Sequence, residues 1–169
     1  MTGGLAVALL VAGCGGDGTP AGPSWVAAAP SATPESGPTS APVALSLGRA
    51  RARYLEIVRP YNTALEAFES AAQAGRAWTA LRPLAAKVAA ANRTHGRALR
   101  DTTWPARVRE PVTALLRETD AAQREWERAA RAETAAELLD AVNAAIRHSG
   151  AKQAGAVRSA LGLAAYTES

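Results

Sequence analysis

Apolar residues recur with helical spacing along the chain from about residue 44 onward. In the first periodic stretch, two interleaved heptad positions carry the apolar residues, and the larger side chains fall on one of them. This larger set is Leu47, Tyr54, Tyr61 and Phe68, and the other set is Ala50, Ile57, Ala64 and Ala71. Large residues that face smaller ones along a seam let two helices approach closely. The pattern predicts an amphipathic helix that ends at Gly75.

The same periodicity predicts three more helices. The second begins near 79–83 and ends by Thr103-Trp104-Pro105, where the proline can open the third. The fourth begins at the capping box Thr134-Ala135-Ala136-Glu137, and Gly150 and Gly155 weaken its middle enough for a break there. The expected inner faces are Leu81, Leu84, Val88, Ala91, His95 and Leu99; then Val108, Val112, Leu115, Thr119, Ala122, Trp126 and Ala129; and finally Leu138, Val142, Ile146, Val157 and Leu161.

Four such helices joined by short turns predict an all-α fold, an antiparallel up-down four-helix bundle over residues 44–169. The composition agrees, because the chain is rich in Ala and has few of the β-branched and aromatic residues that favour strands. An extended dimeric coiled coil is the alternative. It is less favoured because prolines interrupt three of the seams.

Residues 1–13 form an uncharged apolar segment. It is too short to span a bilayer, which takes about 20 residues, and it fits the apolar region of a secretory signal. The following Leu10-Val11-Ala12-Gly13-Cys14 resembles the lipobox of bacterial lipoproteins. This resemblance implies cleavage between Gly13 and Cys14 and acylation of the Cys14 sulfur. No Lys or Arg precedes Leu5, so an uncut apolar N-terminus with an ordinary buried cysteine is the alternative.

Residues 14–43 are rich in Pro, Gly, Ser and Ala and show no periodic apolar face. Such a segment buries too little surface to offset its ordering entropy, so we predict a disordered tether. It would span about 30 Å as a flexible coil and about 90 Å if extended. With the lipobox, this predicts a protein anchored by lipid on the outer face of the cell membrane.

The stretches RYLEIVRPYNTALEAFE, LRDTTWPARVREPVTALL and VRSALGL resemble segments of small, uncharacterised actinobacterial lipoproteins. The shared features are turns and packing positions. The resemblance therefore implies kinship and no particular activity.

Few residues suggest chemistry. Tyr54, Tyr61 and His95 are a candidate ligand pocket, with His95 as a haem or metal ligand in the alternative function. A hydrogen-bonded core histidine is the ordinary interpretation, because ferritin-like sites need Glu-x-x-His on two helices and zinc needs three or four donors. His148 is expected to face solvent. We find no catalytic motif, so we predict a non-enzymatic binding or scaffold domain with no catalytic residue, no metal site and no cofactor.

The whole chain has a formal net charge of +4. In the expected bundle, positive and negative side chains are distributed unevenly. The end nearest the tether would gather arginines, and the far end would gather carboxylates. Anionic headgroups attract such arginines, so we predict contact with anionic lipid or an envelope polymer. An unidentified protein partner is also possible from the sequence. We do not expect binding to nucleic acid. The alternative is a solvated surface with a compositional arginine bias. The predicted contact residues are Arg49, Arg51, Arg53, Arg97, Arg100, Arg107 and Arg109.

Overall fold

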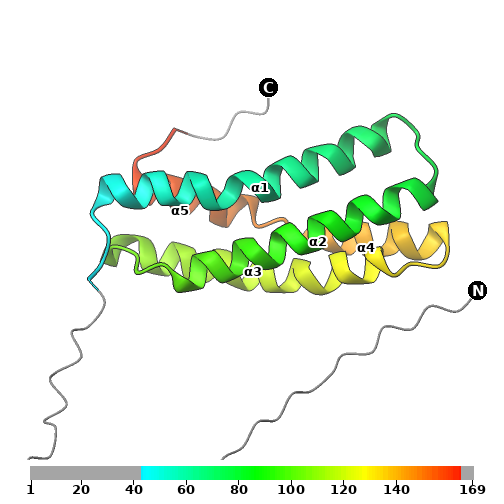
Figure 1. The fold of residues 1–169 in the computed structure, drawn as a ribbon. Helices are drawn as coiled ribbons and strands as arrows, with labels where there is room; N and C mark the ends of the chain where they lie inside the picture. The colour runs from blue at the N-terminus through cyan, green and yellow to red at the C-terminus, as the bar shows by residue number, and fades with distance from the viewer. Residues whose placement is uncertain (1–42, 165–169) are drawn as a thin grey trace, which may run out of the picture. The chain divides into compact units, whose positions relative to one another are not determined.

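The computed structural model describes residues 43–164. These residues form five helices: α1 (Leu47–Gln73), α2 (Trp78–Asp101), α3 (Ala106–Ala130), α4 (Ala135–Arg147) and α5 (Ala151–Leu161) (Figure 1). The predicted signal segment, Cys14 and the tether up to residue 42 lie outside the described residues, as do residues 165–169.

The predicted up-down bundle is confirmed. α1, α2 and α3 run antiparallel in turn, and α4 and α5 together form the fourth, returning helix (Figure 1). No strand occurs within residues 43–164. The fourth helix breaks at Gly150, whose φ of +67° is a left-handed conformation that favours glycine. The second candidate break is absent, because α5 continues through Gly155.

The core consists of two apolar clusters along the bundle. α3 contributes residues to both clusters. All seven of its predicted inward residues are buried, which confirms the face that the sequence assigned to the core. In the cluster at the end where the described chain begins, Tyr54 meets Trp104 edge to face, with ring centroids 6.4 Å apart. In the far cluster, Phe68 and Trp126 make the same type of contact at 5.3 Å. Each T-shaped pair adds about 1 kcal/mol beyond the burial of its area.

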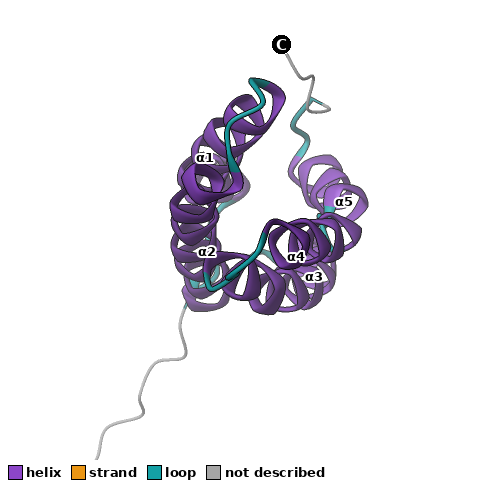
Figure 2. Cartoon of the chain, turned by 90° about the vertical axis from the view of Figure 1, so that its right-hand side faces the viewer, coloured by secondary structure: helices purple, strands orange, loops and turns teal. Residues whose placement is uncertain are grey.

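The bundle is not closed on all sides. α3 packs against α2, α4 and α5, whereas no Cα atoms of α1 and α4 approach within 8 Å among the described residues. Figure 2 shows α1 and α4 separated by α2 and α3. The inward placement expected for Ile146 is therefore wrong: 58% of this residue is exposed, as is 60% of Leu139. These two residues lie seven positions apart on one face of α4, and that face is largely exposed in the described chain.

Two of the five described helices, α1 and α4, begin with a side-chain cap. Ser46 Oγ accepts from the Arg49 N–H at the start of α1, and Thr134 Oγ1 accepts from the Glu137 N–H at 3.2 Å at the start of α4. The Glu137 carboxylate reaches back as predicted, although its partner is the N–H of Glu133, at 2.8 Å. Side-chain acceptors of this type satisfy backbone donors that the first helical turn leaves free.

Candidate functional site

A layer of buried polar side chains separates the two apolar clusters. Asn92 and His95 come from α2, and Thr119 comes from α3. The Asn92 amide donates to the Thr119 carbonyl at 2.9 Å and to Gln123 Oε1 at 3.0 Å. The Thr119 hydroxyl donates to the Leu115 carbonyl. Asn92 and Thr119 are thus satisfied, as buried polar groups usually are.

His95 is the exception in this layer. It is 6% exposed, and within residues 43–164 neither of its ring nitrogens has a hydrogen-bond partner. Its imidazole stacks on the Tyr61 ring, with centroids 5.5 Å apart and planes inclined by 17°. Burial disfavours the charged imidazolium, which lowers the pKa of His95 from 6.5 to about 4. The sequence predicted that His95 would be a core residue with a hydrogen bond. Its burial is confirmed, but it has no hydrogen-bond partner among the described residues.

The structure brings two of the three candidate pocket residues together. Tyr61 and His95 stack, and burial raises the pKa of Tyr61, an effect that a hydrogen bond from the Trp126 side chain partly offsets. Tyr54 lies in the other cluster, where burial raises its pKa to about 12. Among the described residues, no group of three or more His, Cys, Asp or Glu side chains could hold a metal ion.

The predicted arginines do lie towards the end of the bundle at which α1 and α3 begin and α2 and α5 end, which we call the basic end. Three of them are engaged within the domain: Arg53 pairs with Glu56 at 2.9 Å, Arg100 pairs with Asp120, and Arg51 donates to the Leu161 carbonyl. The rest are exposed and have no carboxylate partner within residues 43–164. These four are Arg49, Arg97, Arg107 and Arg109.

The separation of charge is weaker in the middle of the bundle than the sequence suggested. Arg93 of α2 pairs with Glu127 of α3 at 2.6 Å, so positive and negative side chains meet away from the two ends of the bundle. The Gln123 amide and, to a lesser extent, the Arg93 guanidinium donate hydrogen bonds to Glu127 that lower its pKa. The exposed pair contributes little to stability, because water screens it. Of the seven arginines predicted for the basic end, four therefore keep an exposed charge without a carboxylate partner among the described residues.

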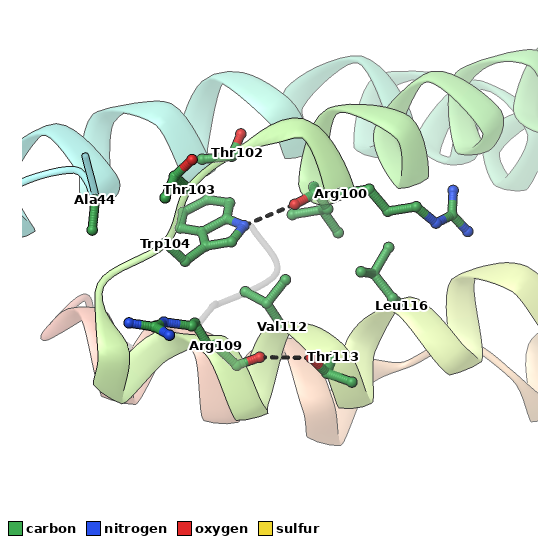
Figure 3. A pocket seen from close by; sticks show the side chains of 10 residues that line it. Ala44, Arg100, Thr102, Thr103, Trp104, Arg109, Val112, Thr113 and Leu116 are labelled. Carbon is green, nitrogen blue, oxygen red and sulfur yellow. Dashed lines mark hydrogen bonds between the residues drawn. The ribbon is translucent and has the colours of Figure 1, made fainter. Parts of the chain in front are cut away.

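A depression of about 540 Å³ opens at the turn between α2 and α3 (Figure 3). Its apolar wall is formed by Leu99, Trp104, Val112 and Leu116. Its polar wall carries two arginines and three threonines, namely Arg100, Arg109, Thr102, Thr103 and Thr113. The Trp104 indole N–H donates to the Leu99 carbonyl at 2.8 Å. This bond fixes the ring under the turn and satisfies a carbonyl at the end of α2.

Sequence reasoning missed this depression. Trp104 was recognised as part of a turn, but Thr102 and Thr103 carried no motif, and Val112, Thr113 and Leu116 lie a helix away. The available signal was the Thr-Thr-Trp-Pro turn between two arginine-bearing helix ends. His148 was placed correctly on the surface, where its Nδ1 lies 2.9 Å from Glu118 Oε2.

Comparisons with protein-family models, curated proteins and solved structures found no match to this chain. None of the described helices combines the length and the apolar character that crossing a membrane requires.

Proposed function

We propose that this protein is a bacterial lipoprotein anchored through Cys14 to the outer face of the cell membrane, and that its helical bundle is a non-enzymatic binding module that turns its basic end towards the bilayer. The support for the anchor is the lipobox-like sequence Leu10-Val11-Ala12-Gly13-Cys14, which follows an apolar segment. Two acyl chains hold a protein durably on a membrane, because each buried methylene contributes about 0.8 kcal/mol.

The observation that carries the orientation is the position of the four unpaired arginines. They gather towards the end of the bundle at which the chain enters from the tether, since the backbone N–H of Leu45 donates to the Thr103 carbonyl at 3.0 Å. Each Arg held near an anionic leaflet adds about 1 kcal/mol of attraction, which decays over a Debye length. A tether that spans about 30 Å as a flexible coil would let the bundle reach the surface of its own membrane.

Mass spectrometry of the native product tests the anchor. The proposal expects a mature chain that begins at Cys14 and carries acyl groups there. Retention of residues 1–13 on an unmodified chain would refute both the address and the orientation.

Vesicle binding tests the orientation. A full chain with Cys14→Ser cannot be acylated on sulfur and can be added to vesicles from solution. We expect it to bind phosphatidylglycerol vesicles more tightly than phosphatidylcholine vesicles, with an affinity that falls as salt rises. Equal binding to both that is insensitive to salt would contradict the proposed orientation.

A second candidate function is a haem- or metal-binding bundle, favoured by the two unpartnered nitrogens of His95. A neutral imidazole with a free nitrogen is a common metal ligand. Purification from cells grown with added haem and iron tests it. A Soret band or stoichiometric metal that His95→Ala removes would support this function, and a colourless, metal-free protein would reject it.

A further inference from the structure

The outer face of α4 exposes two large apolar side chains. Leu139 is 60% exposed and Ile146 is 58% exposed. Seven positions separate them, so they lie on one side of the helix, about two turns and roughly 10 Å apart. Asn143 is exposed between them on the same face, because it follows Leu139 by four positions and precedes Ile146 by three. The shared face distinguishes this apolar pair from apolar residues scattered singly over a surface.

One edge of this face carries a charge of each sign. Asp140 directly follows Leu139 and Arg147 directly follows Ile146, so the two charged residues lie on the same edge, again seven positions apart. Both are exposed, and neither has a hydrogen-bond or ion-pair partner within residues 43–164. The face therefore has an acidic half beside Leu139 and a basic half beside Ile146.

This arrangement is complementary to itself. A twofold axis that relates two antiparallel helices brings each edge of one helix beside the same edge of the other and reverses its direction. An axis close to Asn143 would place Leu139 of each copy against Ile146 of the other. The same axis would place Asp140 of each copy beside Arg147 of the other, which makes two pairs of opposite charge.

We propose that α4 of this protein pairs antiparallel with α4 of a second copy, with Leu139, Asn143 and Ile146 at the centre of the contact and the Asp140–Arg147 pairs along one edge. The support for a second copy over an unrelated partner is that each side chain of the face finds its complement on the same face. Asn143 would meet its counterpart at the axis, where two amides can hydrogen-bond and fix the register. The inference goes beyond the proposed function and does not depend on the membrane anchor.

The dimer should be weak and reversible. α4 has 13 residues and is therefore about 20 Å long, so a contact along it is smaller than the roughly 1,200–2,000 Å² that stable complexes bury. Both apolar clusters of the bundle are also complete within one chain. In the full chain with Cys14→Ser, we expect a dimer that forms at concentrations on the order of 0.1 mM and dissociates on dilution.

Sedimentation equilibrium of two charge variants, each also carrying Cys14→Ser, tests the pairing. Asp140→Arg leaves only positive charge on the edge, and Arg147→Glu leaves only negative charge. Each variant alone sets like charges against each other, so we expect its self-association to weaken about tenfold or more. An equal mixture of the two restores two pairs of opposite charge, and its association should return to within about twofold of the unsubstituted value.

The mixture separates pairing from folding, because a variant that had lost its fold could not regain a partner on mixing. Circular dichroism should show both variants to be helical, since both replaced side chains are exposed. Arg124→Glu is the matched control. It reverses an exposed charge on α3, away from the proposed contact, and should leave the association unchanged.

Cross-linking gives an independent measure of the axis. Cys14 is the only cysteine of the chain, so Cys14→Ser allows a single thiol to be placed at will. In that background, Asn143→Cys would bring two thiols together at the axis, and oxidation by diamide should link the chains. Thr63→Cys, at an exposed position of α1, is the control and should cross-link at least about tenfold more slowly.

Each contrary result overturns the proposal. A chain with Cys14→Ser that stays monomeric up to about 1 mM would show that the face does not self-associate. A dimer that survives Leu139→Gln together with Ile146→Gln would place the interface elsewhere. A mixture of the charge variants that stays monomeric would exclude the antiparallel pairing, as would equal cross-linking of Asn143→Cys and Thr63→Cys.

Discussion

The imidazole of His95 lies against the ring of Tyr61, with centroids 5.5 Å apart, while both of its nitrogens lack a hydrogen-bond partner within the described domain. Stacking covers the ring faces and leaves the edge nitrogens unsatisfied. A buried polar group without a partner costs about 1–3 kcal/mol. His95 therefore lowers the stability of the fold at its core position. We expect the free energy of unfolding to depend on pH through His95 and to change when His95 is replaced.

Acid should destabilise the bundle through His95. The pKa of His95 is about 4 in the fold and 6.5 in the unfolded chain, so the unfolded state binds more protons between these values. Stability that is complete above pH 6.5 then falls towards pH 4, by up to about 3 kcal/mol. Urea unfolding measured across this range should show the loss.

The variant His95→Leu separates the contribution of His95 from that of Glu127. Glu127 has a lowered pKa and also loses its favourable interactions in acid. The difference between the natural chain and His95→Leu removes that shared contribution. A difference in unfolding free energy that does not change with pH would show that His95 is hydrated or hydrogen-bonded in solution.

Substitution within the polar layer should have opposite effects at two neighbouring positions of α2. At pH 7, His95→Leu removes unsatisfied nitrogens and should be neutral or stabilising by about 1 kcal/mol. Asn92→Leu removes an amide that donates to Thr119 and Gln123, and should cost about 1–3 kcal/mol. Urea midpoints of the two variants provide the measurement. Destabilisation of similar size in both would mean that His95 has a partner in solution.

Periodicity predicted the helices well because burial of one face is a local property of sequence. The seven inward residues of α3 follow from spacing alone, since α3 is surrounded by α2, α4 and α5. Ile146 has the same spacing on α4 and is exposed. Which part of the apolar face of α4 is covered depends on tertiary packing, which no local pattern encodes.

The candidate site was predictable only in part, for the same reason. His95 and Tyr61 were recognised as inward residues of neighbouring helices, and they do meet. Tyr54 shares a heptad position with Tyr61, but the bundle is long enough to place the two in different clusters. The depression at Trp104 combines a turn with the side of α3, so its residues have no common spacing.

The indole of Trp104 should contribute to stability through its N–H as well as its area. Trp104→Phe keeps an aromatic ring against Tyr54 but leaves the Leu99 carbonyl without its donor. We expect a loss of about 1–2 kcal/mol in unfolding free energy. Trp78→Phe, at a half-buried position at the start of α2, serves as the comparison and should change stability by less than about 0.5 kcal/mol. Equal effects would show that ring size alone accounts for the loss.

Two glycines of the fourth helix should respond to alanine in opposite directions. At Gly150, φ is +67° and a Cβ would lie 3.0 Å from Leu115 Cδ1, so Gly150→Ala should destabilise the bundle by about 1–2 kcal/mol. Gly155 lies inside α5 with nothing within 4 Å of an added Cβ, so Gly155→Ala should stabilise it by about 0.5–1 kcal/mol. Thermal unfolding of both variants measures the contrast. Stabilisation by both would mean that the fourth helix runs unbroken through residue 150 in solution, because a continuous helix would favour alanine at either position.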